Sequence, residues 1–304
     1  MQRRYVTVDV FSRQRFGGNP LAVIFEAQGL TSAQMQAIAS EFNYSETTFV
    51  LPPTEAHHTA RVRIFTPRAE VPFAGHPNVG TGYVIARQDS LELMPRDLIF
   101  EEAAGLVPIH VSVDASGDII TELTAPEPLS RRSIVAVKDL AACLCLEMSD
   151  LQSNRAPQVI SVGLPFLVAE VRSRDSLHRS KPNLTAFARV LPLDGADSIY
   201  VFTRGVGTEE TSPDWSARMF APFDGIVEDP ATGSAAAALV ALLASESPSE
   251  DADLRLRIEQ GVDMGRPSLL FASARKRHGQ LEAVRVGGYC VAVMEGTITV
   301  AEEL

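Results

Sequence analysis

Cysteine is scarce in this chain of 304 residues, with only Cys143, Cys145 and Cys290 present. An odd and sparse set argues against a disulfide framework and favours a reducing compartment, so we expect a cytoplasmic protein. Cys143 and Cys145 lie two residues apart with no histidine near them in sequence, which is a weak basis for a metal site. We therefore expect core packing or a neutral role for this pair.

Long apolar runs and excess positive charge are also missing. No uninterrupted apolar run approaches the roughly 20 residues that span a bilayer, and the N-terminal MQRRYVTVDVF leads directly into an alternating strand pattern. The chain has 27 Lys and Arg against 38 Asp and Glu, a net charge of −11. Nucleic acids and anionic membranes bind basic surfaces, so neither is expected as a partner. A small-molecule substrate stays open.

One loop-to-helix junction occurs twice in the sequence. Residues 72–86, PFAGHPNVGTGYVIA, have a near-copy at residues 227–241, VEDPATGSAAAALVA. The aligned pairs are Pro77 with Pro230, Gly80 with Gly233 and Thr81 with Ser234. This alignment puts His76 and Asp229 at equivalent places. A repeat of such long period indicates two similar domains rather than a solenoid.

Both junctions lead into a helix that is apolar nearly all round, and such a helix is enclosed by other elements. Strand patterns surround each helix without regular βαβ alternation, which argues against the doubly wound class. We therefore predict an α+β fold of two pseudo-symmetric domains, each a mostly antiparallel β-barrel-like sheet wrapped around a central helix. The expected domains are residues 1–126 and 127–304, with the last strand able to cross back to the first domain.

The junctions also suggest a binding site. The N-terminus of a helix exposes N–H groups and a partial positive charge, and neighbouring glycines let the backbone approach a ligand closely. Two such termini that converge on a cleft between the domains would bind an anion such as a substrate carboxylate. The alternative interpretation is that Gly and Pro only cap buried helices. A single junction would favour helix capping. Because two matched junctions are present, we favour the anion-binding site.

The order of the sequence blocks supports a resemblance. These blocks are VDVFSRQRFGGNPLAVI, EFNYSETTFV, RIFTPRAEVPFAGHPNVGTG, GLPFLV, MFAPFDGIVEDPATGSAAAAL and IEQGVDMGRPS. Over nearly the whole chain they resemble the PhzF-like (phenazine biosynthesis) isomerase family. The resemblance implies the diaminopimelate epimerase-like fold, an active site between the two domains, and a homodimer. No block matches GxGxxG or GxxxxGK[ST], and no feature demands a metal or another cofactor.

The resemblance also assigns roles to individual residues. It makes Glu46 of the SET block the general acid/base. The residues that it places at the substrate are His76, Asp229, Ser234 and, through backbone N–H groups that hold a carboxylate, Gly75 and Gly233. The chemistry is consistent with this assignment, because moving a proton between carbons needs a base that can become an acid, and a carboxylate in a desolvated cleft can serve.

The leading hypothesis is a cofactor-independent isomerase that shifts a proton in a small carboxylate-containing metabolite. One alternative is an epimerase at a single Cα, with His76 or Asp229 as the second base. Racemases of similar fold use two cysteines at these helix starts, and this chain has none there. A single carboxylate therefore favours a proton shift. The other alternative is a non-catalytic binding protein that retains the fold, which the intact residue set argues against.

Two further stretches receive structural interpretations. In IEQGVDMGRPS, the residues Glu259, Gln260, Met264 and Arg266 could line the interface or cleft, but structural packing is the favoured interpretation. The run RSRDSLHRSK, residues 172–181, is predicted to be a surface loop with solvated charges rather than a binding patch.

Overall fold

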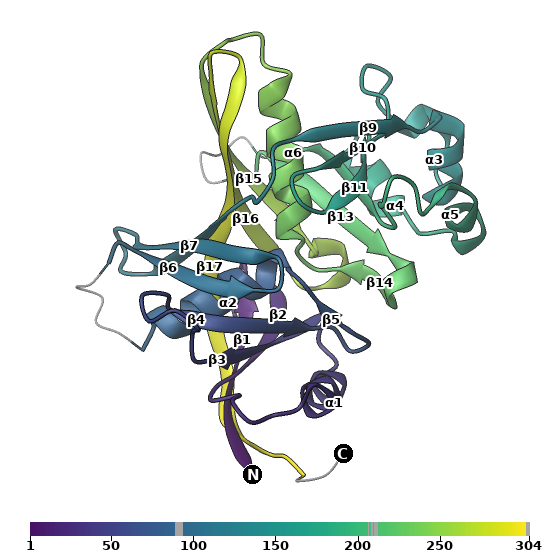
Figure 1. Cartoon of the computed structure of the whole chain (residues 1–304). Coiled ribbons are helices and arrows are strands. Elements are labelled where there is room, and N and C mark those ends of the chain that lie inside the picture. The colour runs from purple at the N-terminus through teal and green to yellow at the C-terminus, as the bar shows by residue number, and fades with distance from the viewer. Residues whose placement is uncertain (89–93, 206, 208, 210–211, 302–304) are drawn as a thin grey trace. The chain divides into compact units, whose positions relative to one another are not determined.

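The structure is a computed structural model of the chain, and it describes residues 1–88, 94–205, 207, 209 and 212–301. The chain forms two compact units (Figure 1). Unit 1 comprises Met1–Thr124 with Gly287–Leu304, and unit 2 comprises Ala125–Val286. The long C-terminal strand β17 (Gln280–Thr299) contributes residues to both. In the described ranges, no helix is long and apolar enough to cross a membrane.

Unit 1 is a closed ring of strands. Its elements are β1 (Gln2–Val10), β2 (Asn19–Ile24), α1 (Ser32–Phe42), β3 (Glu46–Leu51), β4 (Ala60–Phe65), β5 (Glu70–Val71), α2 (Gly75–Ala86), β6 (Arg96–Glu102), β7 (Gly105–Val113) and β8 (Ile119–Thr124). The pairs β2–β3 and β4–β6 are parallel, whereas β1–β2, β3–β4, β6–β7, β7–β8 and β1–β17 are antiparallel. Pairing of β17 with β8 closes the ring.

Helix α2 lies inside this ring (Figure 1) and packs against β1, β2, β3, β7 and β8. All of its residues except Tyr83 and Ile85 are buried. Gly80 permits the closest approach of helix to strands, because a Cβ there would lie 2.5 Å from Leu21 Cδ2 and 2.7 Å from Val10 Cγ2. The apolar pattern of α2 therefore reflects burial on all sides.

Helix α1 packs against β3 and β4. Its N-cap is Thr31, which forms a reciprocal capping box with Gln34. Gln34 also donates a hydrogen bond to the carbonyl of Ala301, at 2.7 Å. A buried apolar cluster lies beneath the helix, and it contains Ile24, Ala27, Leu30, Met35, Ile38, Ala39, Phe49, Phe65 and Val300.

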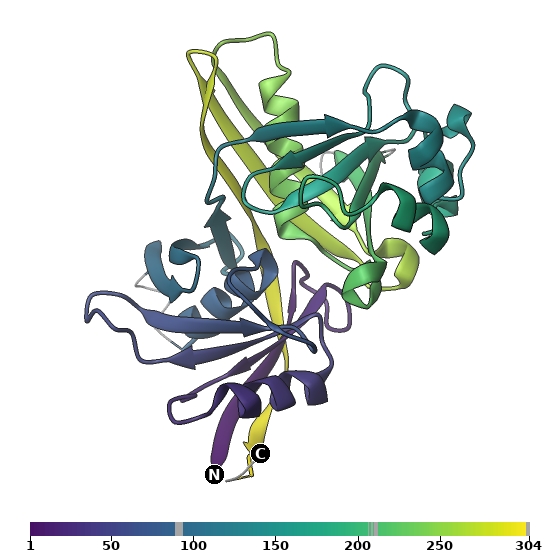
Figure 2. The same ribbon diagram turned by 45° about the vertical axis from the view of Figure 1, so that its right-hand side comes forward.

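Unit 2 wraps its strands along helix α6 (Gly233–Ser245), which packs against β10, β11, β15 and β16 (Figure 2). The strands are β9 (Ser130–Ile134), β10 (Gln158–Ser161), β11 (Pro165–Glu170), β12 (Ile199–Arg204), β13 (Trp215–Ala221), β14 (Ile226–Asp229), β15 (Ala252–Gln260) and β16 (Ser268–Arg277). The other helices are α3 (Val137–Cys143), η2 (Met148–Asp150), α4 (Arg174–Arg179), α5 (Leu184–Val190), η3 (Pro222–Asp224) and η4 (Val262–Met264).

The two units repeat one order of strand pairings. In unit 1 the parallel pair β2–β3 is followed by the antiparallel pair β3–β4 and the parallel pair β4–β6. In unit 2 the pairs β11–β12, β12–β13 and β13–β15 have the same directions. Helix α2 follows the short strand β5, and α6 follows the short strand β14. The predicted α+β fold, with strands around one central helix in each half, is confirmed.

The alignment of the two junctions is wrong in register. Residues 72–74 connect β5 to α2, and residues 230–232 connect β14 to α6. His76 is the second residue of α2, so its structural equivalent is Ser234, the second residue of α6. Asp229 instead ends strand β14. His76 and Asp229 are therefore not equivalent positions.

The physical reason is that the shared Pro-x-x-Gly pattern occupies different places in the two units. Pro77 lies in the first turn of α2, where a residue without an N–H group is tolerated. Pro230 precedes α6 in the connecting loop. Gly80 is consequently a packing residue within α2, whereas Gly233 opens α6.

The prediction of a loop at residues 172–181 is also wrong, although Arg172, Asp175, His178 and Arg179 are exposed as expected. Arg174–Arg179 form helix α4, and the Ser173 side chain accepts a hydrogen bond from Ser176 N at its N-terminus. Arg174 is paired with Asp263, which lies 89 residues further along the chain. Since an ion pair over that separation depends on the tertiary fold, the local sequence carried no sign of it.

Candidate functional site

Glu46 and His76 meet within unit 1. Glu46 is the first residue of β3 and lies beside Leu21 in the parallel β2–β3 pair. His76 lies in the first turn of α2. The Nδ1 atom of His76 is 3.3 Å from Glu46 Oε2, and the side chains are 5% and 19% exposed, respectively. The structure thus joins the predicted acid/base to one of the predicted substrate contacts.

The imidazole of this pair is neutral. Burial lowers the pKa of His76 to about 3, although a hydrogen bond to the backbone carbonyl of Pro20 opposes the shift. In the part of the chain that the structure describes, His76 Nε2 is buried and has no hydrogen-bond partner. A neutral imidazole has one N–H donor and one acceptor nitrogen, so the ring can both donate and accept a hydrogen bond.

Asp229 and Ser234 lie around the start of α6 in unit 2. Asp229 is 7% exposed at the end of β14, and its Oδ2 accepts a hydrogen bond of 2.5 Å from the Thr232 hydroxyl. Thr232 is the N-cap residue of α6, and Ser234 is half-buried in the first turn. The carboxylate is therefore fixed by the loop that leads into the helix.

Gly75 and Gly233 are the first residues of α2 and α6. The N-cap residues, Ala74 and Thr232, make no side-chain hydrogen bond to the backbone of the first turn. The first N–H groups of a helix have no acceptor within the helix, so both termini offer donors and partial positive charge to an anion. The predicted site residues thus form two groups, one in each unit.

The sequence interpretation missed Pro20, which contacts His76, and Thr232, which contacts Asp229. Both residues lie inside the sequence blocks that resemble the family, and their place in those blocks could have marked them as candidates. Tyr200, in β12, is fully buried with a hydroxyl that has no partner among the described residues. Burial, and then the nearby charge of Asp229, raise the pKa of Tyr200 above its usual range. Its sequence context showed only a strand.

A second buried carboxyl group lies close to helix α2. Both carboxyl oxygens of Glu102 are inaccessible, and burial raises the pKa of Glu102 to about 8, a shift that the neighbouring Asn78 amide opposes. Asn78 donates from Nδ2 to the Ala74 carbonyl at 3.0 Å. Glu102 is therefore protonated at neutral pH and packs as a neutral group beside the first turn of α2.

We expect Glu102→Gln to remove a pH dependence of stability. The pKa of Glu102 is higher in the folded protein than the roughly 4.3 of an unfolded chain, so between these values only the folded state holds the proton. The free energy of unfolding of the wild type then falls by about 1.4 kcal/mol per pH unit from this group as pH rises. Urea unfolding at pH 5.5, 6.5 and 7.5 measures the difference.

Glu101→Gln is the matched control. Hydrogen bonds from Glu55 N, from His58 and from Thr54 N hold the pKa of Glu101 at about 2, below its value in an unfolded chain. The Glu101 carboxyl group is therefore ionised at all three pH values in both the folded and the unfolded state. Parallel stability curves for the wild type and Glu102→Gln would contradict the assignment of a protonated Glu102.

Comparisons with known proteins agree over almost the full length. The family described as "Phenazine biosynthesis-like protein" (PhzC-PhzF) matches residues 8–296. The chain is 36% identical over 298 residues to a trans-2,3-dihydro-3-hydroxyanthranilate isomerase of Pseudomonas chlororaphis, covering 97% of this chain and 98% of the relative.

Solved structures show the same similarity. A phenazine biosynthesis protein of the PhzF family from Bacillus anthracis superposes with a TM-score of 0.87 at 26% identity, covering 98% of this chain and 99% of that one. A hydroxyproline epimerase from Agrobacterium vitis has a TM-score of 0.59 at 11% identity, covering 99% of this chain and 93% of its own. The second likeness concerns the fold alone.

Proposed function

Because the chain belongs to the phenazine biosynthesis-like (PhzC-PhzF) family, we propose that it is a cofactor-independent isomerase that shifts a proton within a small carboxylated metabolite. Glu46 takes the proton from one carbon, and the electron pair of the broken C–H bond moves into the carbon skeleton as the double bond shifts. The protonated Glu46 then returns its proton to a second carbon. The enzyme ends the cycle in its starting state.

The observation that carries this proposal is the contact between Glu46 and the neutral His76, at 3.3 Å. A protonated histidine would hold the carboxylate in an ion pair and reduce its strength as a base. A neutral, buried ring leaves the negative charge of Glu46 uncompensated by this neighbour. It also offers a hydrogen-bonding edge to a substrate.

The register of the strands supports a single acid/base. Thr47 pairs with Phe65, and Ile199 pairs with Phe220. These phenylalanines occupy matching places in the repeat, since FTP at residues 65–67 corresponds to FAP at residues 220–222. The preceding residues, Glu46 and Ser198, are therefore equivalents. Since unit 2 has a serine at this place, it supplies no matching second carboxylate, which favours a proton shift over two-base epimerisation.

The remaining roles follow the two helix starts. We propose that the backbone N–H groups of Gly75 and Gly233 bind the carboxylate of the substrate, and that His76, Asp229 and Ser234 orient its other polar groups. The candidate substrate is trans-2,3-dihydro-3-hydroxyanthranilate, for which a relative is named. A homodimer in the cytoplasm completes the proposal, on the basis of the family resemblance and of the scarce cysteines.

A screen for ligands followed by an exchange assay tests the function. Small carboxylic acids, including trans-2,3-dihydro-3-hydroxyanthranilate, are screened by thermal shift, and every hit is then incubated in D₂O with the enzyme and followed by NMR. We expect at least one hit to exchange a C–H proton with solvent and to yield a double-bond isomer. Inversion at a single Cα would instead establish an epimerase, and binding without exchange for every hit would establish a non-catalytic binder.

A further inference from the structure

Gln260 uses its whole side-chain amide on the loop that carries Asp229. It is the last residue of β15 and is 1% exposed. Its Nε2 donates to the Asp229 carbonyl at 2.9 Å and to the Thr232 hydroxyl at 3.0 Å. Its Oε1 accepts from Thr232 N at 3.1 Å. A buried amide that is satisfied so completely by one loop fixes the conformation of that loop.

These contacts give the hydrogen bonds a direction. A flipped amide would bring Gln260 Oε1 against the Asp229 carbonyl, so the orientation is determined by its partners. Because the Thr232 hydroxyl accepts from Gln260, its own proton is directed to Asp229 Oδ2, at 2.5 Å. Each hydrogen bond in such a chain polarises the next. The side chain of Asp229 is thus held by Gln260 through Thr232.

The backbone of the same loop is held by the segment that follows Gln260. Ser268 Oγ donates to the Pro230 carbonyl at 3.0 Å. Gly261 has φ +75°, and a Cβ there would lie 2.6 Å from the Pro230 carbonyl oxygen. Glycine is therefore required for the close approach of this turn to the loop.

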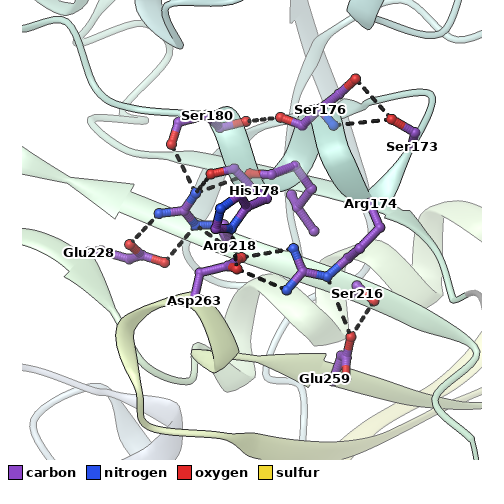
Figure 3. A network of polar contacts seen from close by, with 11 residues as sticks. Ser173, Arg174, Ser176, His178, Ser180, Ser216, Arg218, Glu228, Glu259 and Asp263 are labelled. Carbon is purple, nitrogen blue, oxygen red and sulfur yellow. Dashed lines mark hydrogen bonds and ion pairs between the residues drawn. The ribbon is translucent and has the colours of Figure 1, made fainter.

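A network of ion pairs holds strand β14 next to Asp229 and the short helix η4 after Gln260 (Figure 3). Glu228, next to Asp229, accepts two hydrogen bonds from Arg218, at 2.8 and 2.7 Å. Asp263, in η4 shortly after Gln260, accepts two from Arg174, at 2.9 and 3.0 Å. The network thereby sets the positions from which Gln260 and Asp229 reach Thr232.

We propose that Gln260 is a positioning residue for the reaction, which holds the Asp229 carboxylate in its working orientation through the Thr232 hydroxyl. The proposal rests on the proposed function in taking Asp229 as a substrate contact. The sequence favoured a structural packing role for Gln260, whereas the proposal gives this residue a role in the reaction. Gln260 acts at a distance from the substrate, and its effect passes through Thr232.

Kinetics of four variants test the coupling. With trans-2,3-dihydro-3-hydroxyanthranilate as substrate, we expect Gln260→Leu and Thr232→Val each to lower kcat/KM by roughly 10²-fold, the loss that a small misplacement of a reacting group causes. The double variant should be no slower than the slower single variant. Thr232→Ser keeps the hydroxyl and should keep the rate. A wild-type rate for Thr232→Val, or losses that multiply in the double variant, would overturn the proposal.

Crystal structures of Gln260→Leu and Thr232→Val decide the matter if that compound is not turned over by the wild type. We expect the Asp229 side chain to leave its orientation or to occupy two conformers. An ordered, unmoved Asp229 in both variants would refute the positioning role, whatever the fate of the proposed function. The absence of turnover by the wild type, by contrast, counts only against the proposed substrate.

Gln34→Leu is the matched control for loss of a buried amide. Gln34 is 2% exposed, lies in α1 of unit 1, and uses its amide on Thr31 N and on the Ala301 carbonyl. We expect this variant to lower the melting temperature about as much as Gln260→Leu does, with kcat/KM within twofold of the wild type. If Gln34→Leu and Gln260→Leu lost activity equally, the loss in Gln260→Leu would be explained by general destabilisation of the protein. That result would overturn the proposal.

Discussion

Glu46→Gln should abolish exchange of substrate protons with solvent deuterium and lower kcat by roughly 10²- to 10⁴-fold, the contribution of a general acid/base. The amide has nearly the same shape as the carboxylate but cannot accept and return a proton at neutral pH. Glu46 lies at the start of β3 beside His76, so the substitution should leave the fold and the binding of a carboxylate ligand largely unchanged. NMR in D₂O measures exchange, and thermal shift measures binding.

Glu41→Gln is the matched control, because Glu41 is exposed on α1 and loses the same charge. It should exchange and turn over substrate at the wild-type rate. Full turnover by Glu46→Gln would end the proposal that Glu46 moves the proton. Loss of ligand binding in Glu46→Gln, with the melting temperature unchanged, would indicate a binding role for this residue.

Arg218→Met should destabilise unit 2 by about 3–5 kcal/mol, the cost of removing one partner of a buried ion pair. Arg218 donates through Nε and Nη2 to Glu228, and through Nη1 to the carbonyls of Leu177, His178 and Ser180 (Figure 3). Methionine fills part of the space but leaves Glu228 and these carbonyls without their donor. The free energy of unfolding in urea measures the loss.

Arg179→Met provides the comparison, because Arg179 lies on helix α4, whose Leu177 and His178 carbonyls Arg218 contacts. Arg179 pairs with Asp150 and Asp175, but its side chain is 46% exposed, so solvent screens these pairs. Its substitution should leave the unfolding midpoint close to that of the wild type. An equally small effect of Arg218→Met would show that the buried network does not stabilise unit 2.

The sequence predicted the family, the fold class and a PhzF-like isomerase, and all three are confirmed. The fold could be predicted because two helices without a polar face, in a chain otherwise rich in strand patterns, must be enclosed by those strands. The roles of the site residues stay predictions. Their strongest structural support is the contact of Glu46 with His76 in unit 1.

The sequence alignment of the two junctions gave the wrong register, because it rested on one short motif, Pro-x-x-Gly. Pro-x-x-Gly occurs within α2 but partly before α6, so the motif placed His76 opposite Asp229, whereas the helix starts place it opposite Ser234. The difference matters for the chemistry. Asp229 belongs to a strand end and is oriented by a loop, and His76 belongs to a helix terminus and is oriented by burial.

The sequence by itself determined the two strand-wrapped helices and the blocks that contain the candidate site residues, because apolar periodicity and turn chemistry act over a few residues. Only the tertiary structure decided that His76 is neutral, since burial by distant strands sets its pKa. The same holds for the contact of Gln260 with Thr232 and for the pairing of Arg174 with Asp263. Protonation and long-range pairing depend on which segments pack together, and no local pattern contains that information.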